Sequence, residues 1–220
     1  QLSNGSVWIT ELVVREILQN VESRRDVRTG RKKCHLISSS IDRGGAERQV
    51  AITLKQLSRS RDFECSLAVH RLKSMEKFGT YEGELCGMEK LIFDMSKVRN
   101  NNENSPGNQI IENKREILGL LDKVVRKKVE QLILHFSEHQ PDLVHAWQDE
   151  TILTSCIAAA LTKIPVIIAS ARSLGPEEKT VLHLRKRPYM KSCFKEIFKW
   201  DCHYLSTNSK AGRKSYAKWI

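Results

Sequence analysis

Residues 34–58 read CHLISSSIDRGGAERQVAITLKQLS, and this stretch decides the fold. An apolar run leads into Gly44 and Gly45. The residues after the glycines show the spacing of a buried helix face, at Val50, Ala51, Leu54 and Leu57. The stretch predicts a strand at 34–38, a glycine loop and a helix at 46–58. Because glycine tolerates positive φ and a helix N-terminus favours phosphate or carboxylate, the loop is either a tight turn or an anion site.

The same alternation of apolar runs and helical spacing continues along the chain. Further strands are predicted at 63–70, 90–95, 142–147, 166–170 and 203–207. Helices are predicted at 110–139 with a break near Gly119, at 150–161, within 177–199 and at 208–219, and a polar loop at 99–108. Strands that alternate with helices predict right-handed βαβ units and a parallel sheet. The fold class is therefore α/β, a Rossmann-like three-layer domain.

The first 32 residues are predicted to be an appended helix and linker before a domain at 33–220. An amphipathic stretch within 7–18 indicates the helix, and ESRRDVRTGRKK at 22–33 indicates the charged linker. The apolar stretch 151–170 is interrupted by Lys163 and Pro165. It therefore indicates a helix followed by a buried strand, not a membrane span.

Charge and cysteine usage limit the classes of partner. Residues 171–220 hold twelve Lys or Arg and four Asp or Glu, so this region carries +8 of the net charge of +11. Such a patch favours polyanions, anionic membrane surfaces or phosphorylated substrates, or is a solvated helix face. The six cysteines form no C-x-x-C pair. They indicate free thiols in a reducing cytoplasm and no metal site.

Ligands of such folds bind beyond the carboxyl ends of the strands. This rule selects four loops, at 41–46, 146–150, 171–176 and 207–210. In the second loop, an indole and hydrogen-bonding groups suit sugar recognition, with Trp147 as a stacking platform. The alternative is a half-buried His145, with Asp149 or Thr151 capping the next helix.

In the third loop, Arg172 offers a forked cation suited to phosphate or carboxylate. The alternative is a surface ion pair with Glu177 or Glu178. In the fourth loop, Asn208 and Ser209 are predicted to cap the last helix instead of contacting a ligand.

Taken together, these segments resemble the N-terminal half of a family 4 glycosyltransferase, a retaining enzyme of the two-domain GT-B architecture. GGAERQV resembles the first-loop motif of that family, and PDLVHAWQDE resembles its P-D-[VI]-[VI]-H segment. IPVIIASARSL resembles the next strand, and YLSTNSKAGRKSY resembles a later strand and helix. The resemblance runs from about residue 33 to 220.

The resemblance implies an acceptor-binding domain of an enzyme that transfers a sugar from a nucleotide-sugar to a polysaccharide or a lipid-linked acceptor. A UDP- or GDP-linked sugar would be the co-substrate, with no tightly bound cofactor and no metal. The C-terminal donor-binding domain of the family is missing from these residues. The chain alone is therefore expected to be inactive and to bind no nucleotide-sugar tightly.

The resemblance also suggests roles for individual residues. The donor diphosphate is expected at Gly44, Gly45 and Ala46, and the acceptor at His145, Trp147, Gln148, Asp149 and Ser173. Many members carry a His where Ala171-Arg172 stand here. The expected catalytic role therefore falls to Arg172, which can stabilise negative charge.

Family members that use lipid-linked acceptors commonly dock on the membrane through a cationic helix. Arg185, Lys186 and Arg187 are accordingly expected to face an anionic membrane, which implies a cytoplasmic protein held peripherally at its inner face. One rival hypothesis is a non-catalytic Rossmann-like module that binds nucleic acid or another polyanion through the basic C-terminal region. Its aromatic residues, however, are spaced as in a helix core. Another is a NAD-dependent oxidoreductase, against which the missing G-x-G-x-x-G fingerprint counts.

Overall fold

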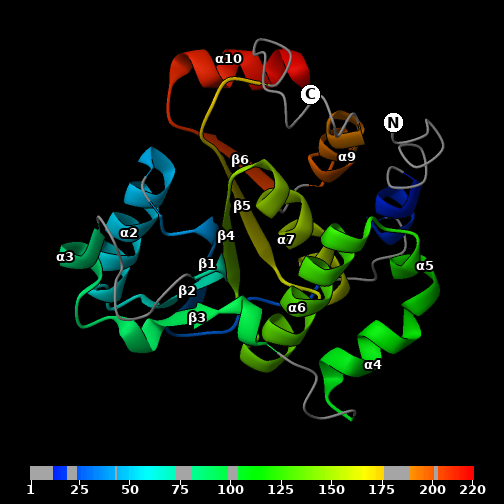
Figure 1. The fold of residues 1–220 in the computed structure, drawn as a ribbon, viewed down its shortest axis with the longest axis horizontal. Helices are drawn as coiled ribbons and strands as arrows, with labels where there is room; N and C mark the ends of the chain where they lie inside the picture. The colour runs from blue at the N-terminus through cyan, green and yellow to red at the C-terminus, as the bar shows by residue number, and fades with distance from the viewer. Residues whose placement is uncertain are drawn as a thin grey trace.

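The computed structural model describes residues 12–18, 24–42, 44–72, 81–98, 104–175, 189–200 and 203–220. The described strands form one parallel sheet in the order β3–β2–β1–β4–β5–β6 (Figure 1). They are β1 (Lys32–Ser40), β2 (Phe63–Arg71), β3 (Ile92–Asp94), β4 (Leu143–Trp147), β5 (Val166–Ala171) and β6 (His203–Thr207). The order runs outward from the β1–β4 pair in both directions, so the topological switch lies between these strands. The predicted Rossmann-like α/β fold is confirmed.

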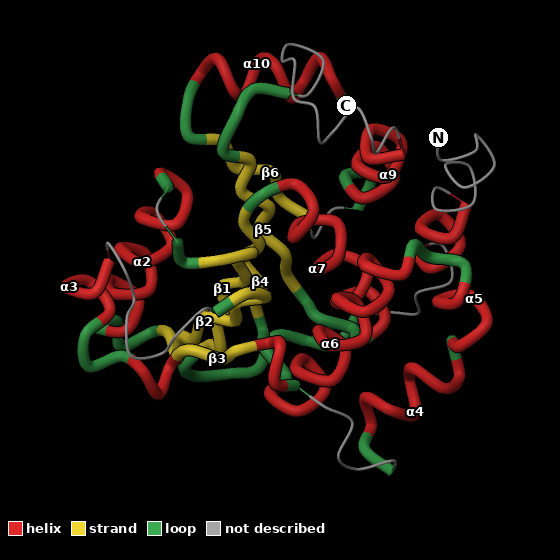
Figure 2. Tube along the Cα trace, viewed as in Figure 1, coloured by secondary structure: helices red, strands yellow, loops and turns green. Residues whose placement is uncertain are grey.

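Helices cover both faces of the sheet (Figures 1 and 2). They are α2 (Gly45–Ser58), α3 (Glu82–Leu85), α4 (Pro106–Asn113), α5 (Arg115–Gly119), α6 (Lys123–His139), α7 (Asp149–Leu161), α9 (Tyr189–Ile197) and α10 (Lys210–Trp219). Residues 12–18 are also helical, and the 3₁₀ turns η2 (Glu89–Leu91) and η3 (Met95–Lys97) flank β3. The helix predicted at 46–58 begins at Gly45, next to its predicted start.

Two hydrophobic clusters hold these layers together. One cluster joins α2 to β1 and β2, and Leu36 belongs to it. The other joins α6 and α7 to the opposite face, where Ile37 points. Because both faces of the strands are buried, their sequences read as nearly continuous apolar runs.

The apolar stretch 151–170 is a central helix followed by a strand, as predicted. Every residue from Thr151 to Ala160 in α7 is buried, because the helix packs between its neighbours and the sheet. No helix among the described residues combines the length and the apolar character that a membrane span requires.

The region between β3 and β4 corrects one prediction and confirms another. The loop predicted at 99–108 does not extend to residue 108, because α4 begins at Pro106 and the Ser105 hydroxyl caps it by accepting a hydrogen bond from the Asn108 backbone. Residues 99–103 of this prediction lie outside the described residues. A Ser–Pro pair at N-cap and N1 is a helix start signal, which the polar composition of this segment obscured. The helix predicted at 110–139 is broken near Gly119, as expected, and α6 starts anew after the capping Asp122.

Residues that precede β1 in the sequence pack against the domain and cross the amino ends of the strands. Val13, Val14, Ile17 and Leu18 of the first described helix belong to the larger core cluster. Asp142 lies just before β4 with a 1% exposed side chain, and it accepts hydrogen bonds from the Lys33 backbone N–H at 2.9 Å and from Arg28 Nε at 3.0 Å. Arg25 pairs with the same carboxylate at 3.4 Å. The segment predicted as a linker therefore crosses the amino ends of the strands as a strap.

Candidate functional site

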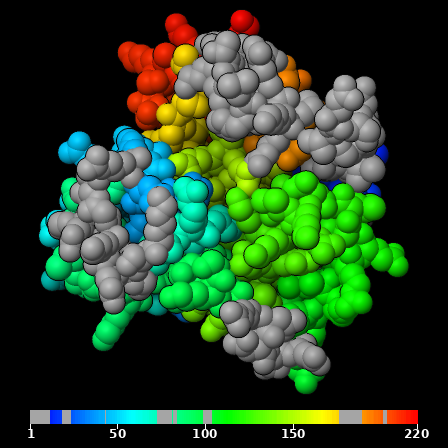
Figure 3. Space-filling view, viewed as in Figure 1, coloured from blue at the N-terminus to red at the C-terminus, as the bar shows by residue number. Residues whose placement is uncertain are grey.

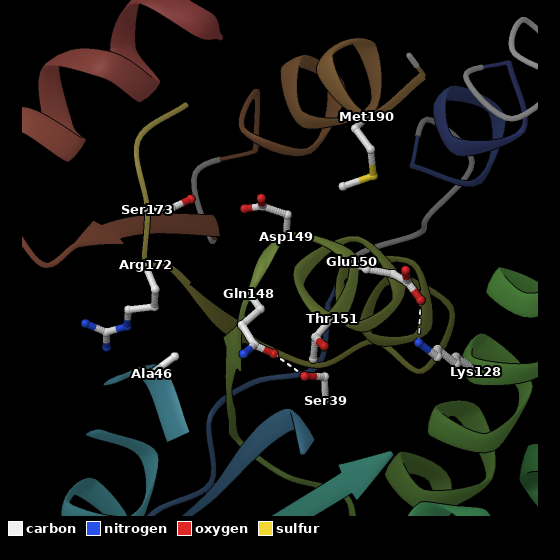
Figure 4. Close-up of a pocket in the computed structure, with 10 residues that line it drawn as sticks. All are labelled: Ser39, Ala46, Lys128, Gln148, Asp149, Glu150, Thr151, Arg172, Ser173 and Met190. Carbon is white, nitrogen blue, oxygen red and sulfur yellow. Dashed lines mark hydrogen bonds and ion pairs between the residues drawn. The ribbon is translucent and has the colours of Figure 1, made fainter. Parts of the chain in front are cut away.

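A cavity of about 370 Å³ opens at the carboxyl edge of the sheet (Figure 4). Ten described residues line it: Ser39, Ala46, Lys128, Gln148, Asp149, Glu150, Thr151, Arg172, Ser173 and Met190. They come from the end of β1, the start of α2, helices α6, α7 and α9, and the loop after β5. The structure thus brings together three of the four loops that the strand-end rule selected. The fourth loop does not line the cavity, and there Ser209 caps α10 as predicted.

The glycine pair serves a different purpose from the one expected. Gly44 has φ 173°, which is extended backbone open to any residue, and Gly45 is already the first residue of α2. The glycine pair is therefore not required here for a positive φ. A Cβ on Gly44 would lie 2.0 Å from Glu47 Oε2, because the Glu47 side chain folds back over this position. Gly44 is needed because it leaves room for that carboxylate.

The backbone of Gly44 is also fixed by an aromatic side chain. Its N–H donates to the Tyr81 hydroxyl at 3.0 Å, and that hydroxyl donates to the Gly44 carbonyl at 2.5 Å. A Cβ on Gly45 would meet nothing within 4 Å, so the first turn of α2 is uncovered there. The N–H groups of this turn have no intrahelical acceptor, and Ala46 places the turn on the cavity wall.

Gln148 connects the first and second loops. Ser39 Oγ donates to its Oε1, and its Nε2 donates to Glu47 Oε1 at 2.8 Å. Its backbone has φ 74° and ψ 148°, a region that is essentially restricted to glycine and costs about 1–3 kcal/mol. A strained residue held by side-chain bonds from two other elements is typical of a functional site.

Asp149 and Thr151 do not cap α7, which corrects one alternative from the sequence. Gln148 occupies the N-cap position, and no side chain caps this helix start. Asp149 instead accepts a hydrogen bond from the Tyr216 hydroxyl at 2.7 Å, which links α7 to α10.

Trp147 is a core residue and not an open stacking platform. Its side chain is 2% exposed and packs in the cluster under α2. The guanidinium carbon of Arg172 lies 3.7 Å from the centroid of the indole ring, a cation–π contact. The expected acceptor stacking on Trp147 is therefore corrected, because Arg172 and the core already cover the indole.

Arg172 is half-buried and is one of the residues that line the cavity, with its guanidinium on the side of Ala46 (Figure 4). Its Nε is buried without a hydrogen-bond partner, and it makes no ion pair with a described residue. Burial lowers the pKa of Arg172 to about 10, so it stays a cation at neutral pH. The alternative ion pair with Glu177 or Glu178 lies outside the described residues.

His145 does not line the cavity, and it supports Trp147 from the strand. Its Nε2 lies 2.6 Å from Ser170 Oγ, and its ring centroid lies 4.7 Å from that of Trp147. Burial and the charge of Arg172 lower the pKa of His145 to about 4, so the ring is neutral at neutral pH. The half-buried alternative describes His145, and its expected acceptor contact stays a prediction.

The sequence analysis assigned no ligand contact to five lining residues: Ser39, Lys128, Glu150, Thr151 and Met190. Lys128 of α6 pairs with Glu150 of α7, and only the packing of these two helices could have revealed this contact. Glu47, Asp149 and Glu150 thus each have a partner, while Arg172 is a cation with no ion pair among the described residues. The site therefore suits a ligand with hydroxyl groups and one anionic group.

Several predictions concern features that lie apart from the cavity. Arg185, Lys186 and Arg187 lie outside the described residues, so their expected membrane contact stays a prediction. Within the part of the chain that the structure describes, no group of three or more His, Cys, Asp or Glu side chains could hold a metal ion. None of the described cysteines is in a disulfide, and Cys34, Cys65 and Cys156 are buried.

Comparison with known proteins leaves the family open. No family model matches the chain, and no curated protein matches it. The functional argument therefore rests on the geometry of the cavity and on the motifs that form it.

Proposed function

We propose that the cavity serves sugar transfer and that this chain is the acceptor-side domain of a retaining GT-B glycosyltransferase. The donor would be a UDP- or GDP-linked sugar, and the acceptor a polysaccharide or a lipid-linked saccharide. The motif resemblance supports this class, and so does the position of the cavity at the topological switch of a parallel sheet. One observation carries the proposal. Arg172, a half-buried cation without an ion pair among the described residues, lines the cavity beside the start of α2.

The chemistry of the leaving group explains why such a cation is needed. A departing nucleoside diphosphate gains negative charge, and a fixed guanidinium stabilises that charge most when it needs no reorganisation. Stacking on Trp147 holds Arg172 in place. The N–H groups in the first turn of α2, which have no intrahelical acceptor, would add a second favourable site for the phosphate.

The neutral lining suits a saccharide. Ser39, Gln148, Thr151 and Ser173 bring hydroxyl and amide groups to a cavity within the usual size range of small-molecule sites. The carboxylates of Asp149 and Glu150 are held by Tyr216 and Lys128. Neither stands free as a general base.

The acceptor proton therefore has another destination in our proposal. As the acceptor oxygen bonds to the anomeric carbon, the bond from that carbon to the phosphate oxygen breaks. The departing phosphate oxygen takes the acceptor proton on the same face of the sugar, which retains the anomeric configuration. Arg172 stabilises the diphosphate throughout this exchange.

A transfer assay with the full-length protein tests the proposal. Transfer of labelled sugar is measured from a panel of UDP- and GDP-sugars to saccharide and lipid-linked acceptors. Arg172→Ala is expected to lower kcat by about 10²-fold, as loss of a preorganised charge-stabilising group does. Arg59→Ala removes an exposed cation at the far end of α2 and should leave kcat unchanged.

Two results would contradict the proposal. One is the absence of transfer from any donor in the panel. The other is an Arg172→Ala variant that is as active as the Arg59→Ala control. Arg172→Lys separates the effect of charge from the effect of donor geometry, because it keeps the charge but loses the forked donors.

A further inference from the structure

Helix α10 separates its residues into two opposite faces. Gly212, Ser215, Tyr216 and Trp219 are buried against the domain. Lys210, Arg213, Lys214 and Lys218 are exposed. At 3.6 residues per turn, the four cations fall within an arc of about 140° and span about 12 Å along the helix. The outer face of α10 is therefore a row of cations.

The sequence of β6 and α10 supplies no acidic residue that could neutralise this row. Residues 203–220 contain no Asp or Glu. None of the four cations forms an ion pair with a residue that the structure describes. The helix lies at the edge of the molecule, where the space-filling view shows its atoms at the surface (Figures 1 and 3).

The buried face of α10 is joined to the cavity. Tyr216 donates its hydroxyl to Asp149, a lining residue, at 2.7 Å. The Gly175 backbone N–H, three residues after Arg172, donates to Ser215 Oγ at 2.6 Å. The row of cations thus lies on the opposite side of α10 from the residues that bond to Asp149 and Gly175.

We propose that the outer face of α10 binds a linear, polyanionic glycan, the extended part of an acceptor whose end reaches the cavity. This inference rests on the proposed function and adds the charge of the acceptor to it. The charge of the four cations suits a polyanion, and the bonds from the buried face of α10 to Asp149 and Gly175 place a polymer bound there close to the cavity. Tyr216 and Trp219 are buried, so the face offers no ring for stacking nucleic-acid bases.

Binding of heparin oligosaccharides, used as a polyanionic glycan probe, tests the inference without a transfer reaction. The test variant changes Lys210, Arg213, Lys214 and Lys218 to Gln. The control variant changes four exposed lysines on other elements, Lys90, Lys114, Lys123 and Lys127, to Gln, so both lose the same charge. We expect about tenfold weaker binding for the α10 variant and a near wild-type affinity for the control. Wild-type affinity should fall steeply between about 50 and 200 mM salt.

Each of the following results would contradict the proposal. Equal losses in the two variants would show that net charge alone attracts the probe. No binding of heparin at low salt, or tighter binding of oligo-dT or of phosphatidylserine vesicles than of heparin, would assign the face to another partner or to none. Circular dichroism and urea unfolding confirm that the α10 variant is folded. Because transfer activity is not measured, failure here leaves the transferase assay unaffected, and failure of transfer leaves this binding measurable.

Discussion

At the amino ends of the strands, the Asp142 carboxylate is 1% exposed and is bonded by the Lys33 backbone and by the side chains of Arg25 and Arg28. At the carboxyl ends of the same sheet, Trp147 Nε1 and Arg172 Nε are buried without partners. The Asp142 carboxylate is satisfied where the strap closes the sheet, although Arg24 Nε of the same strap is also buried without a hydrogen-bond partner, and Arg172 Nε is unsatisfied where the cavity opens. The first arrangement stabilises the domain, and the second leaves groups available for a ligand.

The backbone conformation also differs between the two ends of β4, at the glutamine before the strand and the glutamine after it. Gln140 precedes the strand with φ 48° and ψ 61°, the left-handed conformation that commonly ends a helix such as α6. Gln148 follows the strand with φ 74° and ψ 148°, which only glycine adopts readily. The strain is thus concentrated at the cavity.

The largest expected effect on stability is at the amino edge. Asp142→Ala leaves two arginines and the Lys33 N–H without their acceptor and should lower the free energy of unfolding by about 3 kcal/mol. Urea unfolding measures it. Glu112→Ala breaks an exposed ion pair with Arg115 and should change stability by less than about 1 kcal/mol. Equal effects of the two substitutions would mean that the strap does not stabilise the sheet.

The pH dependence of stability is the next largest effect and reports on the histidines where α6 packs on β1. His35 Nδ1 lies 3.1 Å from His135 Nε2, and the His139 ring lies against both. Burial, followed by the charges of His139 and Lys33, lowers the pKa of His35 to about 3. An unfolded histidine has a pKa of about 6.5, so between these values the unfolded chain binds a proton that the folded chain excludes. Stability is therefore lost as pH falls.

For His35 alone, the loss between pH 7.5 and pH 5 should be about 2 kcal/mol. Urea unfolding at both pH values measures the loss, and His35→Gln should reduce it. Asp142→Asn is the matched control. Hydrogen bonds from Lys33 and Arg28 outweigh burial and hold the pKa of the Asp142 carboxyl below its usual value, so its stabilisation is lost only at lower pH. A wild-type pH slope in His35→Gln would contradict the assignment.

Backbone strain at the carboxyl edge gives a smaller effect. Gln148→Ala removes the bonds to Ser39 and Glu47 but keeps a side chain in a conformation suited to glycine. Gln148→Gly removes the same bonds and relieves the strain. The glycine variant should therefore be about 1–2 kcal/mol more stable than the alanine variant. Identical stabilities in urea unfolding would show that the backbone at Gln148 is not strained.

The sequence predicted the sheet, most helices and three of the cavity-lining loops, because these features follow from local spacing and strand alternation. The orientation of side chains at the site could not be obtained this way. Trp147 ends an apolar strand, and only the tertiary packing of the cluster that it shares with α2 shows that its indole is covered. Lys128 lies 22 residues before its partner Glu150, on a different helix. Contacts of that kind depend on the tertiary fold, which local periodicity does not encode.

The smallest expected effect tests the role of the glycine loop. Gly44→Ala introduces a Cβ that would lie 2.0 Å from Glu47 Oε2, but it causes no backbone strain because φ is 173°. The Glu47 side chain is flexible at its far end, so it should move away and lose its bond to Gln148. The loss of one such hydrogen bond costs about 1 kcal/mol.

A double-mutant cycle isolates this mechanism. In a Glu47→Ala background the obstructing carboxylate is gone, and Gly44→Ala should then have almost no effect on the free energy of unfolding. The coupling energy between the two positions would account for nearly the whole cost of the single substitution. If Gly44→Ala remained as destabilising without Glu47, the glycine would be required by its backbone and not by the carboxylate. The loop would then have to be explained by its contact with Tyr81, whose hydroxyl bonds both the N–H and the carbonyl of Gly44.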